Sequence, residues 1–304
     1  MHEVISLLIN RSDFFLQLLW EHIEISLSAS IIAIIIGGLL GVLIHEYKRL
    51  SGPVMLAVNF LYTIPSISML GLLLYVSGVG NTTAVIALVI YALLPMVRNT
   101  FTGLNQIKSD MREAGIALGL TRLQRLWNIE IPLAMPTIMA GIRTMLVMTI
   151  ALTGIASFIG AGGLGVAIYR GITTNQSALT IAGSLLIALL AIVVDALFSL
   201  GERVTRISPN MKRYTIIFLS TMTLIAMAVG GWSLYCRHVK ADVIHIATKP
   251  MTEQLILGNV LKELIEHKTN LTVEVTEGVG GGTSNIQPAM RTGQFDIYPE
   301  YTGT

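Results

Sequence analysis

Few residues in this sequence have the types and spacing that catalysis requires. Four glycines within 160–165 are spaced like a phosphate-binding loop, but they follow an apolar helical run rather than a strand, and no Lys-Ser or Lys-Thr pair closes the pattern. The single cysteine, Cys236, excludes an internal disulfide framework and a cysteine-rich metal site. We therefore predict no catalytic residue, metal site, cofactor or ATP hydrolysis on this chain, and we interpret the glycine segment as a flexible loop.

Two ionisable residues, Arg143 and Asp195, interrupt long apolar runs. A charge inside a membrane is costly, so such residues pair, extend toward the interface or line a transport path. We expect pairing or an extension toward the inner interface at both positions. A substrate gate at Arg143 is the alternative.

The first two-thirds of the chain hold one polar, charged stretch, residues 109–136. Ser109 is predicted to cap a first helix, which Gly119 ends in a left-handed conformation. Thr121 and Gln124 have the spacing of a capping box that starts a second helix, and two prolines near its end are predicted to disturb that helix. This hairpin has an apolar rim and contains neither histidine nor cysteine, so we expect it to dock in a groove of a partner protein.

Composition places these elements in a membrane. Hydrophobic residues make up 53% of the chain and charged residues 12%, and the mean hydropathy is +0.70. The net charge of +2 is too small to indicate nucleic-acid binding. Residues 1–24 are predicted to lie at the membrane interface, and about six spans of roughly 20 residues, the third of them short, are predicted to cross the bilayer. They cover 25–44, 54–76, 82–97, 134–159, 178–200 and 214–235.

Basic residues gather in the loops that follow the first, third and fifth spans. These loops contain Lys48, Arg49, Lys108, Arg112, Arg122, Arg125, Arg203, Arg206, Lys212 and Arg213. Since Lys and Arg mark the cytoplasmic side, the hairpin is predicted to be cytoplasmic. The amino terminus and the tail after residue 240 are predicted to lie outside.

The sequence changes character after Cys236. Strands are predicted at 243–247, 271–276 and 295–298, and helices at 252–267 and 285–291, which is the opening of an α/β sheet. About sixty residues are too few to close such a core. We therefore expect residues 241–304 to be one truncated part of a larger lobe, and residues 208–240 to form the sixth span and a linker.

The hairpin carries a spaced motif that consists of Glu113, Ala114, Gly115, Gly119, Ile129 and Pro132. In this spacing it resembles the cytoplasmic "EAA" loop of ABC importer permeases, with Gly115 in place of the usual second alanine. The resemblance implies an all-α polytopic membrane domain of the type I ABC importer fold over residues 25–207. It also implies that these six residues contact a separate ABC ATPase subunit, present in two copies. The permease would work as a homodimer or a paired permease in the bacterial cytoplasmic membrane.

Three segments of the tail, 249–254, 280–284 and 296–304, resemble the first lobe of the binding proteins for glycine betaine, choline and carnitine. The resemblance implies a partial, periplasmic-binding-protein-like α/β lobe outside the cytoplasm. Aromatic faces hold a trimethylammonium group at roughly 0.5–2 kcal/mol per ring. A carboxylate needs hydrogen-bond donors instead. Tyr301 is the predicted aromatic wall, and Lys249 and Thr304 are the predicted partners of the carboxylate.

Together these observations predict the transmembrane subunit of an ATP-driven importer for quaternary-ammonium osmoprotectants, with a fused substrate-binding domain. Two alternatives stay open. One is an ABC importer permease for another small solute such as an amino acid, and the other is a membrane-anchored solute receptor, against which the hairpin argues. The predicted partners are the ABC ATPase, a second permease, membrane lipid and the solute, with no nucleic acid.

Overall fold

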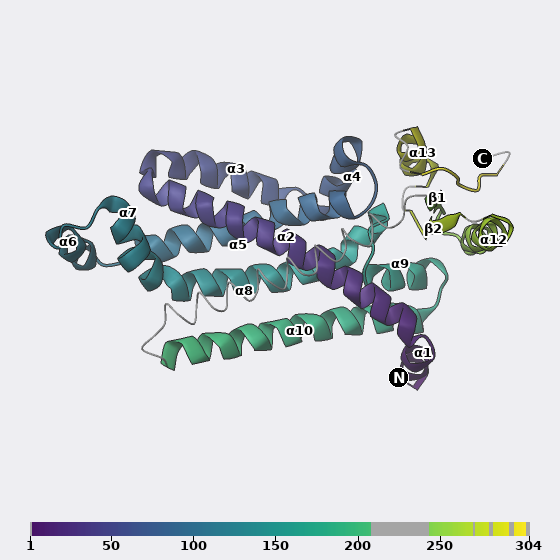
Figure 1. Ribbon diagram of the computed structural model, residues 1–304, viewed down its shortest axis with the longest axis horizontal. Coiled ribbons are helices and arrows are strands. Elements are labelled where there is room, and N and C mark those ends of the chain that lie inside the picture. The colour runs from purple at the N-terminus through teal and green to yellow at the C-terminus, as the bar shows by residue number, and fades with distance from the viewer. Residues whose placement is uncertain (1, 208–242, 270, 280–281, 292–294, 302–304) are drawn as a thin grey trace.

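The computed structural model of the chain describes residues 2–207, 243–269, 271–279, 282–291 and 295–301. Long helices lie side by side through most of the molecule, and a small α/β unit lies at one end (Figure 1). Four of the described helices are long and apolar enough to cross a membrane, and one bent helix pair raises this to five spans if the pair is counted as one. The predicted span 214–235 lies outside the described residues.

The chain begins with α1 (His2–Asn10) and α2 (Ser12–Glu46). α2 is a single helix of 35 residues, so the predicted boundary between an interfacial segment and a first span, at residue 24, falls inside it. Phe15 and Leu18, near its start, are buried in one apolar cluster with residues of later helices. The first turns of α2 are therefore ordered by packing within the protein.

The predicted second span, 54–76, consists of two helices that meet at a sharp bend. The short turn η1 (Lys48–Leu50) leads into α3 (Ser51–Thr63), and α3 meets α4 (Ser66–Ser77) at an angle of 100°. Pro65 breaks the helix because proline lacks an N–H and drives the preceding residue to an extended conformation. Ile64 accordingly has ψ 127°, and the Tyr91 hydroxyl donates a hydrogen bond to its carbonyl.

α5 (Asn81–Asn105) continues past residue 97, where the third span was predicted to end. Two glycines of α2 let this helix approach closely. A Cβ on Gly41 would lie 2.5 Å from the Cβ of Thr100, and a Cβ on Gly37 would lie 2.8 Å from the side chain of Met96. Small residues at such contacts let helices pack tightly in membranes, so α2 and α5 form a closely packed pair.

The hairpin comprises α6 (Ser109–Ala117), α7 (Arg122–Arg125) and the π-helical turn η2 (Leu126–Glu130), and α8 (Ile131–Ala156) follows directly. Helix continues for 38 residues from Arg122 to Ile159. Prolines 132 and 136 were predicted to disturb the second helix, and a π-helical turn does lie directly before Pro132, although the helix is not interrupted. Pro132 lies beside the π-helical turn, where the regular i to i−4 bonds are already displaced, so its missing N–H is tolerated.

The glycine segment follows η3 (Ser157–Ile159) and is packed against α2 and α5. The Gly162 N–H donates to the side-chain oxygen of Asn81 at 2.9 Å, and the Gly163 N–H donates to the Glu21 carboxylate at 3.0 Å. Leu164 is fully buried. The prediction of a flexible loop is wrong. The backbone of this segment lies close to α2 and α5, and the side chains of Glu21 and Asn81 accept hydrogen bonds from its N–H groups.

α9 (Gly165–Thr173) and α10 (Ser177–Ile207) complete the described helices of the bundle. The main apolar core joins α2, α5, α8 and α10, together with the turn that precedes α8. Its buried members are Ala33, Ala92, Met96, Leu104, Leu126, Ala134, Ile138, Ile142, Met145, Leu146 and Phe198. The long helices are thus held by one continuous interior.

In the α/β unit, β1 (Val243–Ala247) and β2 (Thr272–Thr276) pair in parallel with Val243 opposite Thr272. α12 (Thr252–Lys268) connects them and α13 (Thr283–Arg291) follows, which confirms the predicted order. The predicted strand 295–298 is reduced to one bridge between Ile246 and Ile297. A proline two residues later cannot extend the ladder, because it has no N–H to donate.

The hairpin and the α/β unit lie at opposite ends of the helical bundle (Figure 1). Val79, in the turn between α4 and α5, packs in one cluster with Val279 and Ile286 of the α/β unit. Glu277 forms an ion pair with Arg170 of α9. The α/β unit therefore rests on the end of the bundle that is farthest from the hairpin.

Candidate functional site

Local sequence signals shape the turn between α6 and α7. Gly119 has φ +73°, the left-handed conformation predicted for it. The predicted capping box is also present, since the Gln124 N–H donates to Thr121 Oγ1 at 3.4 Å and the Thr121 N–H donates to Gln124 Oε1 at 2.9 Å. The predicted cap by Ser109 is wrong, because this residue is already helical and its hydroxyl donates to Asp110.

The residues predicted to contact an ATPase divide between the surface and the interior of the hairpin. Glu113, Ala114 and Gly119 are exposed, whereas Gly115 is buried. A Cβ on Gly115 would lie 2.9 Å from Ile129 Cδ1, so these two residues meet where α6 packs on η2. A glycine in place of the usual alanine therefore brings α6 closer to η2.

An apolar rim surrounds the exposed positions of the hairpin. Its members, Ile116, Leu118, Leu123 and Trp127, are between 59% and 76% exposed. Pro132, by contrast, is partly buried in the first turn of α8. Clustered exposed apolar side chains at the tip of a bundle make a surface that a partner's groove can cover.

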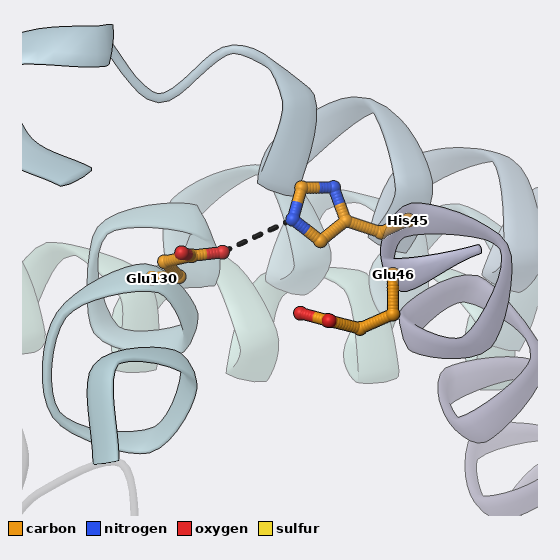
Figure 2. A group of neighbouring side chains, drawn as sticks. All are labelled: His45, Glu46 and Glu130. Carbon is orange, nitrogen blue, oxygen red and sulfur yellow. Dashed lines mark hydrogen bonds and ion pairs between the residues drawn. The ribbon is translucent and has the colours of Figure 1, made fainter. Parts of the chain in front are cut away.

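A buried carboxylate lies directly behind this surface. Glu130, at the end of η2, is 1% exposed, and Arg125 of α7 donates to its Oε1 at 2.7 Å. His45, near the end of α2, places Nε2 3.0 Å from Oε2 of the same carboxylate (Figure 2). The Nε of Arg112 on α6 lies 3.7 Å from Oε1. Three different helices therefore supply the positive and polar groups around Glu130.

The same side chains reach the carboxyl-terminal end of α5. His45 Nδ1 lies 3.0 Å from the side-chain oxygen of Asn105, the last residue of α5. Arg112 donates from Nη2 to the Leu104 carbonyl at 2.6 Å. We call the group His45, Asn105, Arg112, Arg125 and Glu130 the inner hub. It joins the hairpin to the ends of α2 and α5.

The inner hub borders a possible metal-binding group, since ligand atoms of His45, Glu46 and Glu130 all lie within 4.8 Å of one another (Figure 2). Both carboxylates already have cationic partners, because Arg122 pairs with Glu46 and Arg125 pairs with Glu130. A divalent cation would have to compete with these guanidinium groups. The charges here fit a protein-internal ion-pair network better than a metal site.

In the α/β unit, two of the three predicted solute contacts meet at one carboxylate. Lys249 is 8% exposed and pairs with Glu300, to which the Tyr301 backbone N–H also donates at 3.1 Å. Thr283 donates to Glu300 at 2.7 Å. The Lys249 ammonium and the Thr283 hydroxyl lower the pKa of Glu300 from 4.5 to about 2. The Tyr301 ring is 40% exposed, and the third predicted residue, Thr304, lies outside the described residues.

Arg143 and Asp195 form the pair that the sequence suggested. Two hydrogen bonds join the guanidinium of Arg143 on α8 to the carboxylate of Asp195 on α10, at 2.5 and 2.6 Å. The side chains are 35% and 39% exposed on the surface of this single chain. The prediction of pairing is confirmed, and a two-point contact of this type also fixes α8 relative to α10.

Sequence reasoning did not assign roles to His45, Glu130 or Glu300. Glu130 lies inside the hairpin motif, between Ile129 and Pro132, and a charge among apolar residues there was the available signal. His45 ends an apolar run and lies 85 residues before its partner, so local patterns do not connect them. Glu300 lies beside the predicted aromatic wall.

Comparison with known proteins identifies the families that the two parts of this chain match. Residues 31–207 match the family described as binding-protein-dependent transport system inner membrane component, and residues 242–304 match the substrate binding domain of ABC-type glycine betaine transport system. The ergothioneine transport permease/ergothioneine binding protein EgtU of Helicobacter pylori (strain G27) is 36% identical over 281 residues, which cover 90% of this chain and 51% of that protein. This chain thus spans about half the length of that relative.

Shorter relatives match the helical part. The glycine betaine/carnitine/choline transport system permease protein OpuCD of Bacillus subtilis (strain 168) is 42% identical, over 66% of this chain and 87% of that protein. The osmoprotectant import permease protein OsmW of Salmonella typhimurium (strain LT2) is 44% identical, over 64% of this chain and 92% of that protein.

A solved structure shares the fold. The MetNI methionine ABC transporter in an inward-facing conformation aligns with a TM-score of 0.59 at 21% identity, over 62% of this chain and 95% of that chain. At this identity the likeness establishes the type I importer fold alone. Because the match over residues 31–207 covers more than half of the sequence, this chain belongs to the family of binding-protein-dependent transport system inner membrane components, the multi-pass permeases of ABC importers.

Proposed function

We propose that this chain is the transmembrane subunit of an ATP-driven importer for small quaternary-ammonium solutes in the bacterial inner membrane. The observation that carries the proposal is the arrangement of two unlike surfaces, the hairpin at one end of the bundle and the solute-binding segment at the other (Figure 1). This arrangement supports a cytoplasmic hairpin and an extracytoplasmic lobe. The basic loops on the hairpin side agree with this orientation.

We further propose that the hairpin docks on a separate ABC ATPase, with two permeases and two ATPases in the working complex. Glu113 and Ala114 offer an exposed helical surface beside the apolar rim, while Gly115 and Ile129 hold α6 against η2. Closure of the ATPases on ATP would move the hairpins, and the spans would reorient between outward and inward access. ATP hydrolysis itself belongs to the partner in this proposal.

The proposed solutes are glycine betaine, choline and carnitine. The names of the relatives support this class, and the exposed ring of Tyr301 offers a face for a trimethylammonium group. Lys249 and Thr304 remain the proposed partners of a carboxylate, which would have to displace Glu300 from Lys249. A second candidate is ergothioneine, because the relative that matches both the helical part and the tail carries that name.

The test is uptake by proteoliposomes that contain the protein and its ATPase. Uptake of labelled glycine betaine, choline, carnitine, ergothioneine and a panel of standard amino acids is measured with ATP on the ATPase side, and non-hydrolysable ATP is the control. ATP-dependent uptake of one quaternary-ammonium solute supports the proposal. Uptake of an amino acid alone would favour the other importer, and solute binding without any uptake would favour a receptor.

A further inference from the structure

We propose that His45 is a positioning residue for the coupling of ATP hydrolysis to transport, because it ties the hairpin to the inner ends of α2 and α5 through Glu130. The proposal rests on the importer function proposed above. It assigns a role within that function to a side chain of α2, outside the hairpin.

The argument begins with the burial of Glu130. A carboxylate that is 1% exposed is costly unless it is paired and hydrogen-bonded. Arg125 supplies one close donor at 2.7 Å from within the same helical hairpin. The other close donor, His45 Nε2 at 3.0 Å, comes from a different part of the bundle. Arg112 Nη2 also lies 3.4 Å from His45 Nε2, so three basic side chains meet around this carboxylate.

His45 is itself buried, at 7% exposure, and both of its ring nitrogens have partners. Nδ1 lies 3.0 Å from the side-chain oxygen of Asn105 at the end of α5. One imidazole ring therefore spans the gap between α5 and the hairpin from its anchor on α2. A displacement of Glu130 strains both contacts of this ring together.

The π-helical turn adds a reason for the position of Glu130. A π-helical turn holds one residue more than an α-helical turn, and each residue of an α-helix rotates the chain by about 100°. η2 (Leu126–Glu130) therefore rotates the hairpin relative to α8. Such turns are frequent at functional sites, and here the turn ends on the carboxylate that His45 binds.

The helices that His45 joins are packed closely enough to transmit a displacement of Glu130. α2 and α5 contact each other without spare room, since a Cβ on Gly41 would lie 2.5 Å from Thr100. α5 and α8 are equally close, since a Cβ on Gly141 would lie 2.4 Å from Asn99. Close-packed interiors transmit strain rather than absorb it. A shift of the inner hub therefore reaches the membrane part of α2, α5 and α8.

The experiment compares His45→Leu, which removes both hydrogen bonds and keeps apolar bulk, with His45→Gln, which keeps a donor. Arg49→Gln, an exposed change in η1 outside the inner hub, is the matched control. Each variant of the permease–ATPase complex is reconstituted, and solute uptake per ATP hydrolysed is measured together with the amount of assembled complex.

We expect His45→Leu to assemble normally and to lose uptake per ATP by about tenfold, the factor that one lost hydrogen bond to a charged group allows. His45→Gln should recover most of the loss, and Arg49→Gln should equal the wild type. An unchanged ratio in His45→Leu overturns the proposal. A parallel fall of hydrolysis and uptake with lost assembly also overturns it, because that result marks a purely structural role.

Hydrogen–deuterium exchange of the permease alone separates this inference from the proposed function. His45→Leu should speed backbone exchange in residues 109–130 by about tenfold and leave the α/β unit unchanged. Equal exchange in the two proteins refutes the tie even if transport works. If the wild-type complex takes up no solute, the importer proposal fails while the exchange result still decides whether His45 holds the hairpin.

Discussion

Substitution of Gly119 tests whether the turn of the hairpin sets the angle at which it meets an ATPase. Gly119 has φ +73°, and a Cβ placed on it would meet no other atom within 4 Å. Any effect of a side chain here is therefore conformational and not steric. The left-handed conformation costs an ordinary L-residue about 1–2 kcal/mol, and more for a β-branched residue such as valine.

Valine and asparagine form a matched pair at this position, because asparagine tolerates the left-handed conformation and valine does not. If the free hairpin relieves the strain by leaving the left-handed conformation, Gly119→Val should weaken assembly with the ATPase by roughly 5-fold to 30-fold. This factor is the conformational cost of about 1–2 kcal/mol expressed as an equilibrium constant. Gly119→Asn should stay within about threefold of the wild type.

The assay is the equilibrium dissociation constant of the permease for the ATPase in lipid nanodiscs, with membrane insertion checked by purification yield. A Gly119→Val hairpin that binds as tightly as the Gly119→Asn hairpin would refute the reasoning, since the turn would then be free to adopt another conformation at no cost. Equal weakening in both variants would refute it as well, because a side chain of any kind would then disturb the surface.

Three further predictions concern packing, pH and orientation. Gly41→Ala should destabilise the bundle by about 1–3 kcal/mol in reversible unfolding. Gly38→Ala should be neutral or stabilising, because its Cβ would meet only the tip of a methionine at 3.7 Å. Similar effects of the two changes would contradict the packing argument. Because the folded pKa of Glu300 is about 2 rather than 4.5, its contribution to the stability of the α/β unit should be complete above pH 4.5 and lost toward pH 2, and Glu300→Gln should remove this dependence in acid titrations followed by circular dichroism. In a cysteine-free background, an impermeant thiol reagent should label a cysteine at Asn175 and not one at Gln106 in intact cells, and the reverse labelling would invert the orientation.

Features that depend on a few neighbouring residues were predictable from the sequence. The left-handed Gly119 and the capping box of Thr121 and Gln124 form as expected, because each requires only contacts within one turn. The break at Pro65 also follows from a local rule, since proline ends the helix that precedes it, but the angle of 100° does not. Ser109 fails as a cap because the helix begins one residue earlier than its pattern suggests, with Lys108 at the N-cap position.

Features that depend on distant residues were not predictable. Pro132 was expected to disturb a helix, and the disturbance takes the form of a π-helical turn that ends at Glu130, whose partners on α2 and α6 local patterns do not reveal. The glycines of 160–165 were expected to be flexible, but Glu21 and Asn81 bind their N–H groups. At the glycine segment, contacts between residues far apart in sequence therefore order a stretch that local composition marks as flexible.

α8 connects the hairpin at one end of the molecule with the α/β unit at the other. α8 is part of a continuous helix that begins at Arg122 in the hairpin and ends at Ile159. The Ile159 carbonyl accepts a hydrogen bond from the Gly80 N–H at 3.2 Å, next to Val79. Val79 in turn packs in the apolar cluster of the α/β unit. Pro132 and Pro136, which were expected to disturb this helix, lie within it without ending it, so a tilt imposed at the inner hub can pass along α8. Because packing of this kind is stiff over its whole length, a movement of the hairpin should be felt at the seat of the α/β unit, and a bound solute should influence the hairpin in return.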